Sequence, residues 1–154
     1  MDKIVMEMCK YLLNNLDHEI TMEELEDVFF YNKFYLIRIF KAYTGYTIKG
    51  FINNVKVLKT IDPLLFTNDT ILKIALNNGF NSQEYYSEKF RNIIGISPIQ
   101  FRKEYRNIDE SSNLEELKGK KKYLLSLKHQ RDILLSMSSS IPQKTKPMTL
   151  KKVA

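Results

Sequence analysis

The 154-residue chain has one cysteine, two histidines and no apolar run long enough to span a membrane. One cysteine excludes an internal disulfide framework and indicates a reducing cytoplasm. Cys9 shares the apolar side of its segment with Val5, Met8 and Leu12, which favours a small core residue over a reactive thiol. The first ten residues also lack the uninterrupted hydrophobic region of a signal peptide.

The motifs of common catalytic and metal sites are missing as well. His18 and His129 lie far apart in the sequence, and no HExxH spacing, glycine-rich phosphate loop or serine elbow is present. The sequence therefore predicts neither an enzyme nor a bound metal or cofactor.

Charge is present in both signs but is distributed unevenly. Residues 1–27 hold two lysines and eight carboxylates, net −6, whereas residues 28–108 carry net +7 and residues 109–154 net +5. A basic surface suits a polyanionic partner. The basic part begins where an internal repeat begins.

The repeat has a period of fifty residues. Its first copy contains Tyr35, Phe40, Lys41, Gly45, Thr47 and Phe51, which recur as Tyr85, Phe90, Arg91, Gly95, Ser97 and Phe101. A period of this size indicates one supersecondary unit used twice. In each copy a helix presents an aromatic and a cation and ends at a glycine, and a hydroxyl residue begins the next helix.

Helical periodicity runs through the first copy. Apolar spacing predicts an amphipathic helix over residues 3–16, and Thr21 with Glu24 forms a capping box for the next helix. The buried stripe of that helix is predicted to be Leu25, Val28 and Phe29. Asn32 is predicted to cap a helix over 33–43 that buries Leu36, Ile39, Phe40 and Tyr43.

A connecting helix is expected to start at Thr47 and to be kinked or stopped by Pro63, giving a rigid spacer of about 20 Å. The second copy then runs in the same order. Asp69 or Thr70 caps a short helix, Ser82 caps a helix over 83–93, and Ser97 with Pro98 opens the last one. No comparable stretch alternates with period two, so the fold class is predicted to be all-α.

Each copy reads as a helix-turn-helix whose second helix can enter a DNA major groove. The outer face of the first such helix combines cations with apolar groups: Lys33, Phe34, Ile37, Arg38 and Lys41. Arginine bonds guanine at two acceptors, lysine neutralises phosphate, and an exposed Phe or Ile packs on a thymine methyl group. An ordinary solvated basic helix is the alternative interpretation.

The outer face of the second helix consists of Gln83, Glu84, Ser87, Glu88 and Arg91 and is nearly neutral. Gln83 can read adenine, whereas a carboxylate can accept from cytosine or repel phosphate. We therefore expect the first copy to dominate binding. The candidate DNA-binding residues are Lys33, Phe34, Ile37, Arg38, Lys41, Thr47, Gln83, Glu84, Ser87, Arg91 and Ser97.

These residues carry a family resemblance over about two thirds of the chain, from Val5 to Arg102. The stretch ILKIALNNGFNSQEYYSEKFRNIIGISPIQFR, residues 71–102, resembles the second-repeat signature of the AraC/XylS family of bacterial transcription regulators. The resemblance implies two homeodomain-like helix-turn-helix subdomains, about 21–45 and 70–95, joined by a central helix. It also implies recognition helices in successive major grooves and, commonly, activation through contact with RNA polymerase.

Several positions depart from the family pattern. Glu26 replaces a small alanine, so either the helices pack more loosely there or Glu26 points outward. Lys56, Thr60 and Pro63 replace an arginine, an alanine and a leucine of the connecting helix, and Glu88 stands where an arginine is common. The Glu88 departure weakens the transfer of the family's base contacts to the second copy of the repeat.

Residues 1–107 are predicted to form the DNA-binding domain and 108–154 an extension. Because few residues precede the first helix, we expect no sensing domain at that end. A helix is predicted over 114–137, packed on the DNA-binding unit, on a partner protein or on an anionic surface, followed by a disordered basic tail over 138–154.

The sequence thus predicts a cytoplasmic, nucleoid-associated regulator that binds double-stranded DNA, with RNA polymerase as a further partner and a monomer favoured. The alternative is a helix-turn-helix module that has lost DNA affinity and acts through protein contacts. Salt-dependent binding to duplex DNA separates the two.

Overall fold

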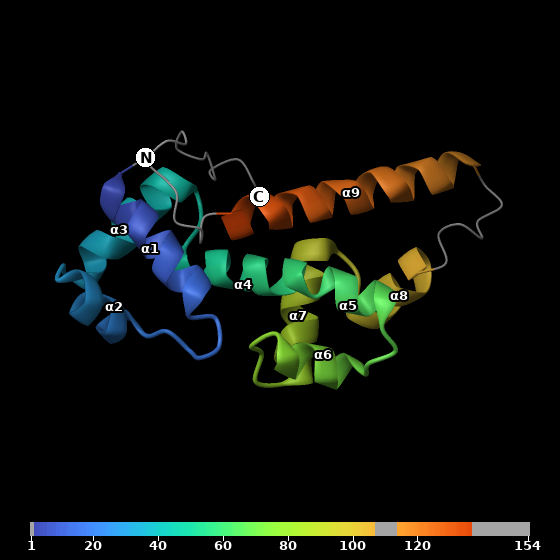
Figure 1. Ribbon diagram of the computed structural model, residues 1–154, viewed down its shortest axis with the longest axis horizontal. Helices are drawn as coiled ribbons and strands as arrows, with labels where there is room; N and C mark the ends of the chain where they lie inside the picture. The colour runs from blue at the N-terminus through green and yellow to red at the C-terminus, as the bar shows by residue number, and fades with distance from the viewer. Residues whose placement is uncertain (1, 107–113, 137–154) are drawn as a thin grey trace. The chain divides into compact units, whose positions relative to one another are not determined.

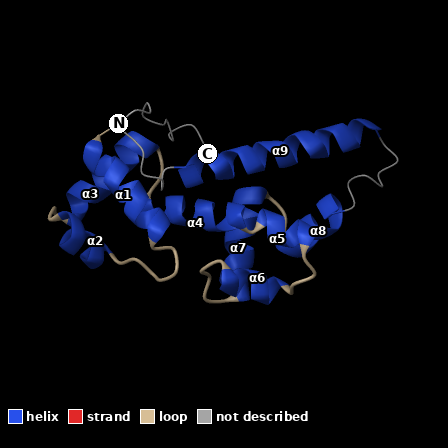
Figure 2. Ribbon diagram, in the orientation of Figure 1, coloured by secondary structure: helices blue, strands red, loops and turns tan. Residues whose placement is uncertain are grey.

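The computed structural model describes residues 2–106 and 114–136, which form nine helices and no strand (Figures 1 and 2). The predicted all-α fold class is confirmed. None of the described helices is long and apolar enough to cross a membrane. The described residues divide into two compact units, the first comprising residues 2–53 and 132–136 and the second residues 54–106 and 114–131.

Four helices begin in the first unit: α1 (Lys3–Asn14), α2 (Met22–Phe29), α3 (Lys33–Thr44) and α4 (Ile48–Lys59). The predicted caps are present, since the side chains of Thr21 and Asn32 accept from the amides of Glu24 and Phe34 at 3.1 and 2.8 Å. Gly45 ends α3 with a φ of 83°, a left-handed conformation that costs glycine little.

The core of the first unit comes from the apolar faces of these helices. Its fully buried side chains are Val5, Met8, Cys9, Leu12, Leu25, Leu36, Phe40 and Phe51. Burial raises the pKa of Cys9 to about 12, so its thiol stays protonated and unreactive, as its apolar setting predicts.

Two predicted core positions are wrong. Tyr43 is 44% exposed, and the next residue, Thr44, is buried instead. The Thr44 hydroxyl donates to the Phe40 carbonyl at 2.8 Å and accepts from the Tyr46 amide at 3.0 Å, so it closes the turn that brings Tyr46 into the core. Val28 is also exposed, at 38%, whereas Phe29 is half-buried with its ring 5.8 Å from the Tyr11 ring.

The second unit contains the end of α4, then α5 (Ile61–Phe66), α6 (Ile71–Asn77), α7 (Gln83–Ile94) and α8 (Pro98–Arg106), with most of α9 (Leu114–Ser136). Thr70 and Ser82 cap α6 and α7 through hydrogen bonds of 3.1 Å to the amides of Lys73 and Tyr85. Its largest fully buried side chains include Leu64, Tyr86, Phe90 and Phe101.

The connecting helix breaks at Thr60, three residues before the proline. Pro63 lies in the first turn of α5, where a helix amide has no intrahelical acceptor and a proline is tolerated. The buried Thr60 hydroxyl donates to the Val57 carbonyl at 2.6 Å and accepts from the Tyr86 hydroxyl at 2.7 Å. Thr60 therefore ties the break between α4 and α5 to the helix α7.

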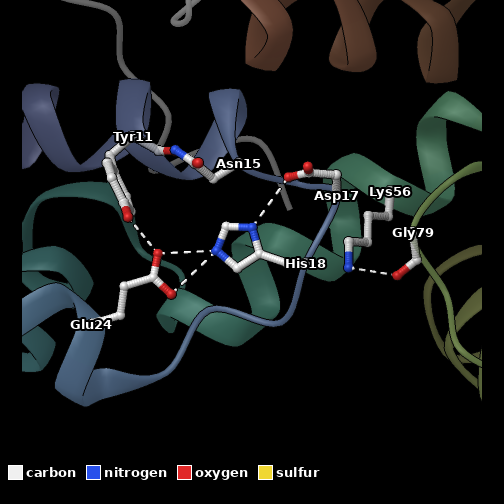
Figure 3. A network of polar contacts seen from close by, with 7 residues as sticks. All are labelled: Tyr11, Asn15, Asp17, His18, Glu24, Lys56 and Gly79. Carbon is white, nitrogen blue, oxygen red and sulfur yellow. Dashed lines mark hydrogen bonds and ion pairs between the residues drawn. The ribbon is translucent and has the colours of Figure 1, made fainter.

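Lys56 also acts within the second unit. Its ammonium donates to the Gly79 carbonyl at 2.9 Å, as Figure 3 shows, and lies 5.6 Å from the centre of the Phe80 ring. Gly79 has a φ of 86° and begins the turn between α6 and α7. The lysine thus supports the turn that precedes α7.

α9 contacts the second unit along several turns. Arg131 and Lys128 meet Asp62 of α5 at 2.9 and 3.6 Å, and Tyr123 donates to the Ile94 carbonyl at 3.3 Å. Leu127 is buried. α9 lies where a helix over 114–137 is predicted. Its contacts with α5 and α7 agree with the first of the three predicted alternatives, in which this helix packs on the DNA-binding unit. The predicted disordered tail over 138–154 lies outside the described residues.

A polar network joins α1 to the start of α2 in the first unit (Figure 3). Glu24 accepts from the Tyr11 hydroxyl and meets His18 Nε2 at 3.0 Å, while His18 Nδ1 lies 3.2 Å from Asp17. The two carboxylates raise the pKa of His18, Glu24 more than Asp17. The hydrogen bond from Tyr11 and the imidazole lower the pKa of Glu24.

The Thr60–Tyr86 pair predicts a non-additive effect on stability. Thr60→Val leaves the buried Tyr86 hydroxyl without its acceptor and should lower the free energy of unfolding by about 2 kcal/mol, whereas Tyr86→Phe should cost about 1 kcal/mol. Removing both polar groups should cost less than the sum of the single changes. Urea denaturation of the four proteins measures this, and strictly additive losses would show that the two hydroxyls do not interact.

Candidate nucleic-acid interface

α3 is held by both of its neighbours in the first unit. α2 and α3 are joined by a short turn in which Phe30 adopts a left-handed conformation with a φ of 59°. Leu36 and Phe40 of α3 enter the core, and the Phe40 ring meets Phe51 of α4 edge to face at 5.4 Å. The opposite face of α3 is left at the surface.

The carboxylate of Glu26 contributes to this arrangement. Its Oε2 accepts from the Lys33 backbone amide at 2.7 Å, at the first residue of α3. A negative charge at this end also complements the helix dipole. Glu26 is half-buried and its carboxylate turns toward α3, so the expectation that Glu26 points outward is wrong.

All five predicted residues of α3 lie on one side of the helix. Phe34, Ile37, Arg38 and Lys41 are exposed, Lys33 is half-buried, and no carboxylate lies among them. Phe34 is 66% and Ile37 41% exposed. The helix therefore presents cations and apolar groups side by side to solvent, as the sequence predicts.

Aromatic rings position two of the cations. The Arg38 guanidinium lies 5.4 Å from the centre of the Tyr35 ring, and Tyr35 packs on Tyr31 at 5.1 Å. The Lys33 ammonium lies 5.5 Å from the Phe34 ring. Stacking on a ring restricts the arginine, so less conformational entropy is lost when the guanidinium binds a planar acceptor.

The corresponding face of α7 is polar. Gln83, Glu84, Glu88 and Arg91 are exposed and Ser87 is half-buried. Lys89 lies 3.8 Å from Glu88 and 5.1 Å from the centre of the Tyr85 ring. The structure thus brings the predicted residues of the second copy together on one helix, but their charges nearly cancel.

Thr47 and Ser97 stand just before α4 and α8. Thr47 accepts from the Gly50 amide at 2.9 Å and Ser97 from the Gln100 amide at 3.1 Å, so both are helix caps. A hydroxyl that accepts a hydrogen bond from a backbone amide can still donate one to a phosphate oxygen. A side chain at position 50 would place its Cβ 2.8 Å from the Thr47 hydroxyl, so glycine keeps this cap intact.

Sequence reasoning missed Phe30 and Tyr31 in the turn before α3. Phe30 is 88% and Tyr31 43% exposed, and with Phe34 and Ile37 they concentrate apolar surface around the start of α3. The signal that could have found them is the presence of six aromatic or aliphatic residues within positions 30–37, more than one helix face can bury. Periodicity alone assigns such residues to a core.

A short helix, a tight turn and a second helix with an exposed outer face occur in both units, as α2 with α3 and as α6 with α7. This arrangement defines a helix-turn-helix protein. A family model described as a helix-turn-helix domain matches residues 25–104. The chain belongs to the AraC/XylS-type family of DNA-binding transcription regulators, and the prediction that it is not an enzyme is thereby confirmed.

Known relatives extend over most of the same region. The TetD protein of transposon Tn10 from Escherichia coli is 29% identical over 100 residues, which cover 65% of this chain and 72% of TetD. The transcriptional activator AarP of Providencia stuartii is 26% identical over 99 residues, covering 64% and 73%.

A solved structure has the same fold. The C-terminal domain of AraT, a response regulator from Geobacillus stearothermophilus, superposes with a TM-score of 0.62 at 26% identity, over 66% of this chain and 85% of that domain.

The Glu26 cap predicts a site-specific loss of stability. Glu26→Ala should lower the free energy of unfolding by about 1–2 kcal/mol, because a charge-assisted hydrogen bond to α3 is lost, and Glu26→Gln should retain part of it. Asp27→Ala, an exposed neighbour on α2, is the control and should stay within about 0.5 kcal/mol of the parent. Equal losses for Glu26→Ala and Asp27→Ala in urea denaturation would contradict the assignment.

Proposed function

We propose that the protein is a sequence-specific regulator of transcription that reads duplex DNA mainly with α3 and secondarily with α7. The observation that carries this proposal is the outer face of α3, where exposed Arg38 and Lys41 flank apolar groups without any carboxylate. Membership of the family indicates DNA as the partner. We rank α3 before α7 because the outer face of α3 is basic, whereas the outer face of α7 is nearly neutral.

In this proposal the residues of α3 divide between bases and backbone. Arg38, held on Tyr35, bonds the O6 and N7 acceptors of a guanine in the major groove. Lys33 and Lys41 neutralise phosphates, which sets the register without reading sequence. Thr47 and Ser97 donate to phosphates at the starts of α4 and α8.

α7 supplies a weaker second contact in the next major groove. Gln83 forms hydrogen bonds with an adenine, and Glu84 accepts a hydrogen bond from the amino group of a cytosine. Ser87 and Arg91 make further polar contacts with the DNA. Residues 1–107 form the DNA-binding domain and 108–154 an extension. The proposal includes action in the cytoplasm at the nucleoid, as a monomer, and activation through contact with RNA polymerase; AarP, a relative, is described as an activator.

The roles of Arg38 and Lys41 predict different losses. Arg38→Ala should reduce discrimination between the preferred and a scrambled duplex by about 1–3 kcal/mol. Lys41→Ala should weaken both duplexes alike and lower the slope of log affinity against log salt by about 1. Fluorescence anisotropy over a salt series measures both, with Lys3→Ala in α1 as a charge-matched control. If both variants lose equally on the two duplexes, Arg38 does not read a base; if the parent binding is insensitive to salt, the proposed function fails.

The unequal faces also predict an order between the two helices. Gln83→Ala should weaken binding to the preferred duplex less than Arg38→Ala, because α7 has a nearly neutral face and contributes less to the total. A gel-shift series with the preferred duplex, selected from a random pool, compares the variants directly. The reverse order would mean that α7 is the leading helix.

A further inference from the structure

The helix α9 carries a dense run of cations. Residues 118–131 contain five lysines and one arginine and no carboxylate. This helix lies beyond residues 25–104, which the helix-turn-helix family model matches, so the shared DNA-binding fold does not account for it. The charges therefore belong to the extension, and their surroundings indicate what they do.

Three of the six cations have partners in the second unit. Lys128 and Arg131 meet Asp62 of α5 at 3.6 and 2.9 Å. Lys120 forms an ion pair with Glu116, one turn earlier in α9, at 3.0 Å. These three charges are compensated by carboxylates, and two of them hold α9 on the unit.

The other three cations face solvent. Lys118, Lys121 and Lys122 are exposed, and because they are three and four positions apart they share one side of α9. Neither Lys118 nor Lys122 forms an ion pair with a described residue. Like charges at this spacing repel one another and destabilise a helix. An anion bound to the cluster would remove this repulsion.

The composition of α9 favours a polymer of phosphates over a lipid surface as the source of that anion. Leu127 is buried and the Tyr123 ring packs on Tyr105 at 5.9 Å, so the apolar side of α9 is used inside the second unit. Leu125 is the one large apolar side chain that is exposed among the described side chains of α9. A helix that lies on a membrane inserts a broad apolar face, which the outer side of α9 lacks.

Contacts within the second unit place the cluster beside the segment between α7 and α8. Tyr123, the neighbour of Lys122, donates to the Ile94 carbonyl at 3.3 Å. Ile94 is the last residue of α7, and Ser97 caps α8 three residues later. In the proposed function, Arg91 and Ser97 contact DNA on either side of Ile94. A lysine of α9 next to this segment is then close to the same phosphate backbone.

We propose that Lys118, Lys121 and Lys122 bind phosphates of the duplex DNA that flanks the half-site read by α7; this rests on the proposed function. A lysine on a phosphate adds affinity without reading sequence, so α9 lengthens the contact with DNA and leaves the base preference unchanged. Three phosphate contacts correspond to a slope of about 2–3 in log affinity against log salt.

Two duplexes of equal length test the proposal. Both carry the site selected from a random pool and a fluorescein label. One continues for about ten base pairs, one helical turn, beyond the second half-site, and the other continues equally far beyond the first. In fluorescence anisotropy at about 0.1 M salt, the parent should bind the first duplex about tenfold more tightly, with a salt slope steeper by about 2–3.

The triple variant Lys118→Gln, Lys121→Gln, Lys122→Gln should bind the two duplexes alike, because it lacks the charges that meet the additional phosphates. All three positions are exposed and glutamine favours a helix, so the variant should fold, which circular dichroism checks. Lys3→Gln, at an exposed position of α1, is the control and should keep the preference of the parent.

The outcomes separate this proposal from the proposed function. If the parent discriminates its site from scrambled duplex but binds the two extended duplexes equally, the role of α9 is wrong and the DNA-binding function stands. A preference that persists in the triple variant also overturns it. If the parent binds phosphatidylglycerol vesicles, the triple variant does not, and the duplexes show no difference, the cluster serves a membrane surface instead. If no duplex is preferred over another, the proposed function fails and this proposal fails with it.

Discussion

A buried edge-to-face pair of phenylalanines, closed by a left-handed glycine turn, is the contact on which each unit depends. Phe40 and Phe51 meet at 5.4 Å in the first unit, and Phe90 and Phe101 at 5.5 Å in the second. Between the partners stand Gly45 and Gly95, with φ values of 83° and 103°. Each pair anchors the inner face of one helix, α3 or α7, on the helix that follows it, α4 or α8. The outer face of α3 and of α7 is therefore turned to solvent.

Because this anchor fixes the inner faces, the outer faces are free to differ. Truncating a buried phenylalanine costs several kcal/mol, whereas surface changes usually cost a few tenths. The two copies accordingly keep their aromatic and glycine positions and diverge at solvent, where Phe34 and Arg38 correspond to Glu84 and Glu88. The same scaffold thus presents two chemically different outer faces while its core contacts stay the same.

The sequence predicts the local features well, because caps and helix ends are encoded within a few residues. Thr21, Asn32, Ser82 and Gly45 act as expected. The errors occur where a hydrogen bond between a side chain and the backbone decides the outcome. Thr44 replaces Tyr43 in the core because the turn to Tyr46 needs its hydroxyl, and the Glu26 carboxylate caps a helix that begins seven residues later. Helical periodicity carries no information on either contact.

Three of the five departures from the family pattern share one physical feature. Glu26, Lys56 and Thr60 are more polar than a tightly packed helix contact allows, yet each makes a hydrogen bond to a backbone group at a turn or helix end: the Lys33 amide, the Gly79 carbonyl and the Val57 carbonyl. A buried or half-buried polar group without a partner would destabilise the fold, whereas a partner at a helix end satisfies a group that the helix leaves open. These substitutions therefore act on the framework that holds α3 and α7 and leave the outer faces of the two helices unchanged.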